Sequence, residues 1–240
     1  MQIRKASIVL WGLTFTLAFG MSACTKSNIP APPAARSYVS ILHLAATAPS
    51  LEVFFDNTKV SSNPFTPGAV SAAYNPVDRG NFPIIFKKAG SDSVVANVPS
   101  VMYDSLHYYT IFVYNLQANG PVQAFRIEDD FRNVTLSKSF YRFLHASPNT
   151  GAVDLYIDNT KNQTGRILAD NTGQVSFNNF LETATGYHNF QVKLAGTDST
   201  IASQANVELL SGAAYTIYLK GLSKGSGSSQ LSLNVLRATN

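Results

Sequence analysis

Apolar residues along most of the chain come in short runs rich in Val, Ile, Phe and Tyr, which is typical of β-strands. Clusters of turn-forming residues such as DNTK, NPFTPG, YNPVDRG and KGSGSS separate these runs. No long stretch combines a helical period with capping residues, so we expect little helix. The predicted strands are 38–45, 51–56, 69–74, 82–88, 93–98, 107–114 and 122–128, then 139–146, 152–158, 174–180, 187–195, 199–208, 213–219 and 230–237.

The pattern also repeats itself along the chain. The segment from Leu42 to Lys59 returns 102 positions later, from Leu144 to Lys161. The triplet Tyr109-Thr110-Ile111 returns 106 positions later, so the second copy carries four extra residues between Lys161 and Gly186. Agreement in order, spacing and identity indicates an internal duplication.

Seven or so strands in about one hundred residues are typical of an immunoglobulin-like sandwich. The sequence therefore predicts an all-β protein with two tandem immunoglobulin-like β-sandwich domains, over 38–130 and 138–240, joined by a linker over 131–137.

The beginning of the chain has the layout of a secretory signal: Arg4 and Lys5, an apolar stretch from Ile8 to Gly20, and a small-residue end. The apolar stretch holds about thirteen residues, whereas a membrane-spanning helix needs roughly 20. The sequence Met-Ser-Ala-Cys that ends it resembles the lipobox of bacterial lipoproteins, in which the cysteine is acylated. We therefore expect a signal peptide over 1–23 and lipidation of Cys24.

Residues 24–37 are rich in proline and alanine and follow no apolar period, so they are expected to act as a semi-rigid tether. At about 3.1 Å per residue it reaches roughly 40 Å. Thr25 is not the aspartate that retains many lipoproteins in the inner membrane, so the resemblance implies the outer membrane. The sequence leaves open whether the domains face the periplasm or the outside.

Composition removes several classes of function. Without Arg4 and Lys5, sixteen basic residues face fourteen acidic ones, and the net charge falls from +4 to +2, which gives no basis for nucleic-acid binding. Cys24 is the only cysteine, so the domains are expected to fold without disulfides or thiolate metal sites. Because no glycine-rich phosphate loop, zinc spacing or paired-carboxylate motif is visible, we expect no cofactor and no metal.

His43 and His145 occupy matching positions in the two copies, and each shares a strand face with apolar residues. We expect buried imidazoles that hydrogen-bond to the backbone. Ser147 lies two residues after His145, but its counterpart in the first copy is Ala45, so a duplicated nucleophile is excluded.

The acidic residues are read as structural. Glu52 and Asp154 match each other, and Asp56 and Asp158 begin the DNTK turns, where we expect turn formation rather than calcium binding or acid catalysis. The run Glu128-Asp129-Asp130 lacks the alternating spacing of a calcium loop and is interpreted as a solvated linker.

The remaining candidates are aromatic side chains and two histidines. His107 and His188 have Ala213 and Phe82 as counterparts, so they do not form a shared ligand set. The tyrosines could include a sugar-stacking platform, but the recurrence of Tyr109 at Tyr215 favours a place in the core or at a strand corner. The members of this group are Tyr103, Tyr108, Tyr109 and Tyr114.

One family shares these motifs. The strings Phe143-Leu144-His145-Ala146-Ser147-Pro148 and Val153-Asp154-Leu155-Tyr156-Ile157-Asp158, with later Gly186-Tyr187 and Tyr215-Thr216, resemble the domain of unknown function 4397 family. The second copy matches over most of its length, whereas in the first copy His43 is followed by Leu-Ala-Ala. The resemblance implies tandem immunoglobulin-like domains in secreted or surface lipoproteins, and no established activity.

These observations predict a non-catalytic, lipid-anchored protein of the cell envelope with a binding or structural role, whose partner is an envelope protein or a glycan. The alternative is a glycan-binding accessory lipoprotein of a nutrient uptake system. A hydrolase would require polar residues from distant loops to converge.

Overall fold

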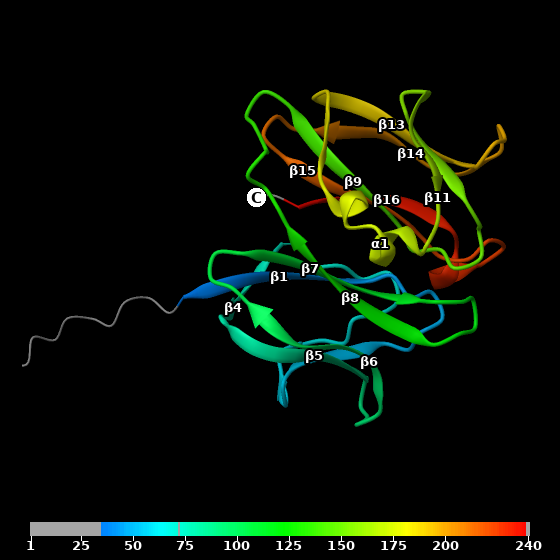
Figure 1. Cartoon of the computed structure of the whole chain (residues 1–240). Coiled ribbons are helices and arrows are strands. Elements are labelled where there is room, and N and C mark those ends of the chain that lie inside the picture. The colour runs from blue at the N-terminus through cyan, green and yellow to red at the C-terminus, as the bar shows by residue number, and fades with distance from the viewer. Residues whose placement is uncertain (1–34, 72, 239–240) are drawn as a thin grey trace, which may run out of the picture. The chain divides into compact units, whose positions relative to one another are not determined.

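The computed structural model describes residues 35–71 and 73–238, and the duplicated halves fold as β-sandwiches of two four-stranded sheets each (Figure 1). In the first copy one sheet has the order β4-β1-β7-β8 and the other β3-β2-β5-β6. The strands are β1 (Arg36–His43), β2 (Leu51–Phe55), β3 (Thr58–Lys59), β4 (Asn75–Asp78), β5 (Gly80–Lys88), β6 (Val94–Tyr103), β7 (Tyr108–Asn115) and β8 (Val122–Asp129).

The second copy repeats this plan with the sheets β12-β9-β15-β16 and β11-β10-β13-β14. Its strands are β9 (Ser139–His145), β10 (Val153–Ile157), β11 (Thr160–Arg166), β12 (Leu181–Thr183), β13 (Gly186–Leu194), β14 (Thr200–Leu209), β15 (Ala214–Lys220) and β16 (Ser232–Arg237). Three short helices complete it, α1 (Asp170–Gly173), η1 (Val175–Asn178) and η2 (Gly227–Ser229). The structure therefore confirms the all-β class and the tandem sandwiches.

The recurring tyrosine fixes the same corner in both copies. Strand β1 runs parallel to β7 with Val39 opposite Tyr109, and β9 runs parallel to β15 with Tyr141 opposite Tyr215. The Tyr109 hydroxyl accepts a hydrogen bond from the Asp104 backbone N–H at 2.9 Å. The Tyr215 hydroxyl does the same with the Leu210 N–H at 2.8 Å, as expected for a residue that ties a strand start to the preceding turn.

Besides the core of each sandwich, a third apolar cluster joins the two copies through the outward faces of β1 and β7 on one side and of β9 and β15 on the other. Alternation along a strand explains this: one face of each strand packs inside its own sandwich, and the other meets the neighbouring copy. The buried members are Leu42, Leu44, Phe112, Tyr114, Ile127, Leu144, Ala146 and Tyr218.

A buried ion pair lies beside this cluster. The guanidinium of Arg142 on β9 binds the carboxylate of Asp129 on β8, and neither side chain is exposed. Arg142 also donates to the Thr110 hydroxyl at 2.8 Å, and the Tyr74 hydroxyl donates to Asp129 at 2.5 Å. Charges removed from water need additional hydrogen bonds of this kind, and both the Arg142 guanidinium and the Asp129 carboxylate make them.

The interpretation of Glu128-Asp129-Asp130 as a solvated linker is therefore wrong. Glu128 and Asp129 end strand β8, where Asp129 points into the contact with the second copy and Glu128 binds His107 at 2.7 Å. Asp130 lies outside the strand and forms an ion pair with Arg132 at 2.7 Å, which lowers the pKa of this carboxyl to about 2. Composition alone could not distinguish an acidic linker from a strand with one buried acid.

Two predicted strands are also wrong. Among the described residues of this range, 69–71, 73 and 74, Val70 forms an isolated bridge and there is no strand; β4 follows at Asn75–Asp78. Residues 174–180 contain the 3-10 helix η1, and the short edge strand β12 comes after it at Leu181–Thr183. Both errors fall in the segment that leads back to the sheet edge, where the copies also differ in length.

The predicted signal peptide and Cys24 lie outside the described residues. Within 35–71 and 73–238, no helix has the length and apolar character needed to cross a membrane.

Candidate functional site: a cleft in the first copy

The first sandwich is closed along one side and open along the other. On the closed side, the Arg126 guanidinium on β8 donates to the Met102 carbonyl on β6 at 2.8 Å. On the open side, the edge strands β4 and β3 belong to different sheets and leave a cleft of about 970 Å³ between them. This volume lies in the range of about 300–1,000 Å³ that small-molecule sites occupy.

The floor of the cleft is apolar. It consists of core side chains that face between the two sheets, together with partly buried phenyl rings that come from β2 and from the segment before β4. These floor residues are Val39, Ile41, Val53, Phe55, Phe65, Val77 and Phe82. The described lining contains no tyrosine and no tryptophan, so stacking on a ligand would come from phenyl rings alone.

The rim carries the polar groups. Arg36 at the start of β1 pairs with Asp78 at the end of β4, at 3.0 Å. Arg79 and Asp56 also line the cleft, are exposed, and form no ion pair with any other described residue. An apolar floor with convergent polar groups at the mouth is the usual chemistry of a site that holds a small ligand.

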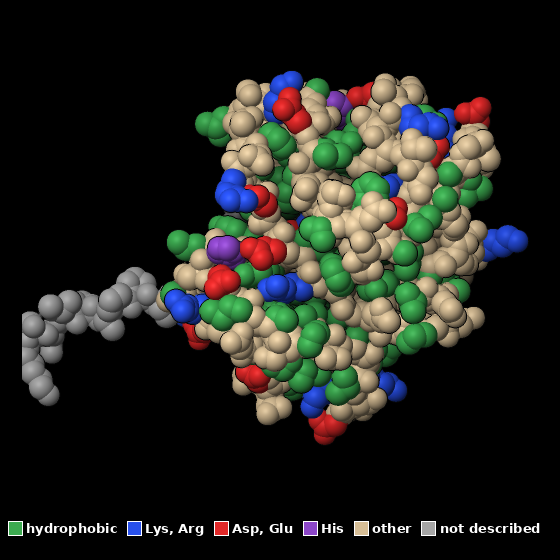
Figure 2. Space-filling model, in the orientation of Figure 1, with side chains coloured by type: hydrophobic (Ala, Val, Ile, Leu, Met, Phe, Trp, Pro, Cys, Tyr) green, Lys and Arg blue, Asp and Glu red, His purple; other side chains and the backbone are tan. Residues whose placement is uncertain are grey.

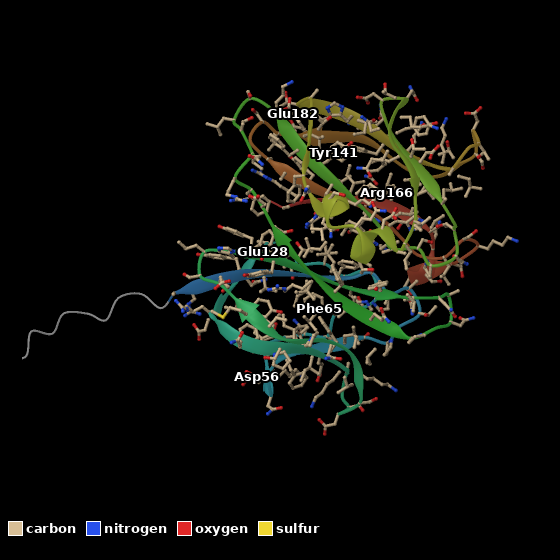
Figure 3. All side chains as sticks on the ribbon, in the orientation of Figure 1. Asp56, Phe65, Glu128, Tyr141, Arg166 and Glu182 are labelled. Atoms are coloured by element: carbon tan, nitrogen blue, oxygen red, sulfur yellow. The ribbon has the colours of Figure 1, made fainter. Side chains whose placement is uncertain are left out.

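The corresponding place in the second copy is filled by the chain itself. Tyr141 stands at the position of Val39 and is buried. In the sheet, Arg166 lies opposite the first residue of β10, and Phe65 lies opposite the first residue of β2, so Arg166 takes the place of Phe65. Figure 3 shows Tyr141 and Arg166 inside the second copy and Phe65 inside the first.

Arg166 is held in this interior position by several contacts. Its side chain is 1% exposed and donates to the Phe143 carbonyl at 3.2 Å, and it pairs with Asp170 at 3.2 Å. Its guanidinium lies 3.9 Å from the centre of the Phe177 ring, which comes from helix η1. Burial lowers the pKa of Arg166, while the Asp170 carboxylate opposes this shift. The extra residues of the second copy thus close the space that stays open in the first.

The helical segment of the second copy that contains Asn171 also differs from the first copy in how it bonds to the strand that carries the matched histidine. In the first copy, the His43 N–H and carbonyl bond to the backbone of Ala69 and Gly68 at 2.8 and 2.7 Å. In the second copy, the Asn171 amide makes both bonds to the backbone of His145, at 3.1 and 2.7 Å. The helical insert of the second copy is therefore anchored to β9 by Asn171.

The predicted role of the matched histidines is confirmed. His43 and His145 are buried, and their Nε2 atoms lie 3.0 Å from the Pro49 carbonyl and 2.9 Å from the Gly151 carbonyl. Burial lowers the pKa of both imidazoles, although these hydrogen bonds act in the opposite direction. Both histidines hold the loop that follows their strand, and neither lines the cleft.

Ser147 does not form a nucleophile–base pair with His145. The His145 Nδ1 atom accepts a bond from the Ser147 backbone N–H at 3.3 Å, and the Ser147 hydroxyl is buried without a described partner.

The matched acids have structural partners. Glu52 pairs with Lys59 at 2.7 Å, and Asp154 pairs with Lys161 at 2.7 Å, so each copy contains the same ion pair between a strand and the end of its DNTK turn. Asp56 and Asp158 have φ angles of 51° and 49°, which confirms them as turn residues in the left-handed region. The Asp158 carboxylate also binds His188 at 2.6 Å.

The tyrosines form no exposed platform in the first copy. Tyr103 and Tyr109 are in the core, and Tyr114 lies in the contact with the second copy. Tyr108 is half-buried and stacks on Tyr38, with ring centres 4.9 Å apart. Among the described residues no group of three or more His, Cys, Asp and Glu side chains has a geometry suited to a metal ion.

The fold and the cleft define a class: a tandem β-sandwich protein in which one copy has an open cleft between its sheets and the other is closed there by its own side chains. A family model described as a domain of unknown function (DUF4397) matches residues 37–156 and 139–239. Because these matches cover most of the chain, the protein belongs to this family. No curated protein matches the chain.

Proposed function

We propose that the protein is a non-catalytic binding protein of the cell envelope, anchored through a lipid on Cys24, whose first copy holds a small ligand with an apolar body. The single observation that carries this proposal is the contrast between the copies. The same position between the sheets is a cleft of about 970 Å³ in the first copy and is filled by Tyr141 and Arg166 in the second.

The lining chemistry supports a ligand that is apolar along most of its length and polar at one end. The floor offers aliphatic and phenyl side chains, whose burial against a ligand contributes roughly 25 cal/mol per Å² of apolar surface. The rim offers Arg79 and Asp56, which can bind a polar end group. The closed second copy then provides a fixed support for the first through the apolar cluster and the Asp129–Arg142 pair.

Titration with dansyl-labelled undecanoic acid tests the proposal, because its fluorescence rises when the probe enters an apolar site. The decisive variant is Val39→Tyr, which places in the first copy the side chain that the second copy already accommodates at Tyr141. The matched control is Val94→Tyr, because Val94 is 56% exposed and lies outside the cleft lining.

We expect the original chain and Val94→Tyr to bind one probe per chain, and Val39→Tyr to lose this binding while circular dichroism shows the same fold. Equal binding by all three chains would contradict the cleft as the site. If the probe does not bind but soluble polysaccharides retard the protein in a gel, the glycan-binding alternative would replace the proposal.

A further inference from the structure

Several exposed apolar side chains gather at the end of the molecule where the described chain begins. Strand β1 starts there at Arg36, and the Leu106 N–H donates to the Arg36 carbonyl at 2.7 Å. Leu136 lies at the same end, in the segment that leads from the end of β8 to the start of β9. Leu106 is 73% exposed and Leu136 is 88% exposed.

Contacts between neighbouring loops bring the turn that carries exposed Leu210 close to Leu136. The Ser211 hydroxyl binds the Leu136 carbonyl, and the Ser139 hydroxyl donates to the Leu210 carbonyl at 2.7 Å. Leu181 of β12, which pairs with β9, and Tyr187 near the start of β13 in the other sheet are also exposed. We call the five side chains the apolar end: Leu106, Leu136, Leu181, Tyr187 and Leu210. Figure 2 shows hydrophobic side chains among charged ones along this edge of the molecule.

Leu106 is displayed at a conformational cost. Its φ angle is 64°, in the left-handed region where leucine is strained. The corresponding residue of the second copy is Gly212, which has a φ angle of 71° and no side chain. The first copy therefore holds an exposed leucine at a turn position that suits glycine, and protein stability alone does not account for this choice.

The charges at this end are largely neutralised in pairs. Arg36 binds Asp78 at 3.0 Å, and Lys138 binds Glu182 at 3.3 Å. Arg132 and Asp130 form a third pair at 2.7 Å. A surface of this kind contacts its partner through apolar side chains rather than through net charge.

The length of chain before β1 determines which partner this surface meets. Twelve positions separate Cys24 from Arg36, a span of at most about 43 Å at roughly 3.6 Å per fully extended residue. We infer that the apolar end rests on the lipid surface that holds the anchor, with its leucines inserted at the boundary between headgroups and acyl chains. This inference rests on the lipid anchor of the proposed function. Side chains of this kind are those that enter the membrane interface in peripheral proteins.

Tryptophan fluorescence tests the inference without background, because the sequence after Cys24 contains no tryptophan. The protein is purified with its lipid and reconstituted on phosphatidylethanolamine–phosphatidylglycerol vesicles, with or without brominated acyl chains. The variant is Leu136→Trp, and the matched control is Val94→Trp. Val94 is also exposed but lies at the far end of β5 and β6, opposite Lys87.

We expect brominated chains to reduce the fluorescence of Leu136→Trp about twofold, since the interface lies within reach of the quencher, and to leave Val94→Trp unchanged. The quenching should persist in high salt, because the contact is apolar. Adding Leu106→Gly should weaken the quenching while raising the midpoint of thermal unfolding, because glycine relieves the strained turn.

Three results would overturn the inference, and they are distinguishable. Protein that sediments with the vesicles but shows no quenching would reject the membrane contact and leave the anchor intact. Protein that does not sediment, with an unmodified Cys24 in its mass spectrum, would reject the anchor of the proposed function as well. A blue-shifted emission of the Leu136→Trp variant without vesicles, with the apparent mass of a dimer, would show that a second copy of the chain covers the apolar end.

Discussion

Removing one partner of the buried Asp129–Arg142 pair should destabilise the protein strongly. In Asp129→Asn the Arg142 guanidinium stays between the two copies, completely buried, without the carboxylate that balances its charge. Breaking a buried pair in this way costs about 3–5 kcal/mol of unfolding free energy. The Tyr74 hydroxyl, which donates to Asp129 at 2.5 Å, loses a charged acceptor in the same variant.

Replacing both charges together should cost less than removing either one. In the double variant Asp129→Leu with Arg142→Met no unpaired charge is left, and apolar residues of similar volume can replace a buried ion pair at little cost. The chain contains a precedent for an uncharged arrangement. Ser40 lies 102 positions before Arg142. The Ala238 N–H donates to the Ala214 carbonyl of β15, at the sheet position that Asp129 takes opposite Tyr108 of β7. Ser40 and Ala238 are both buried and line one small internal space.

Urea unfolding of the chain from Thr25 onward, followed by circular dichroism, measures these differences. The control is Asp92→Asn, because Asp92 is fully exposed in its pair with Lys87 and should leave the midpoint unchanged. A loss below about 1 kcal/mol in Asp129→Asn, or a double variant less stable than both single variants, would refute the reasoning that the pair joins the copies as a buried charge network.

Three further predictions concern the corners, one turn and pH. Tyr109→Phe and Tyr215→Phe should each lower the unfolding free energy by about 1–2 kcal/mol, since each leaves a backbone N–H without its acceptor; a neutral result in urea unfolding would contradict the corner role. Gly221→Ala should destabilise far more than Gly90→Ala, which serves as its control: both have positive φ, but the added Cβ at Gly221 would lie 2.2 Å from a backbone oxygen, whereas Gly90 has open space. Burial lowers the pKa of His145 below 6.5, so as the pH falls the unfolded state binds this proton before the folded state does. The unfolding free energy should therefore be full above pH 6.5 and decrease below it. His145→Gln should make this decrease with pH smaller, and an unchanged decrease would show that His145 does not cause it.

The repeat made most of the fold predictable. Strand periodicity and the recurrence of Tyr109 at Tyr215 depend on local sequence and on packing inside one sandwich, so they could be inferred from the pattern. The buried histidines followed from the same alternation. Both copies share these features, so a residue pattern seen in one copy supported the same structural prediction in the other.

The differences between the copies could not be predicted in the same way. The cleft exists because the residues before β4 in the first copy leave space that Arg166 and helix η1 fill in the second. The burial of Asp129 depends on the contact between the outer faces of two sheets, so the acidic run alone could not indicate it. The four-residue difference in length between Lys161 and Gly186 was the one sequence signal that pointed to this region.

The most direct test of the central claim is to identify what the protein carries when it is purified from the membranes of the cells that produce it. Organic extracts of the original chain and of Val39→Tyr are compared by mass spectrometry, with Val94→Tyr as the control. We expect one amphipathic small molecule, near one per chain, in the original and control proteins and its absence from Val39→Tyr. The same molecules in equal amounts from all three chains would contradict the claim that the first copy's cleft is a binding site.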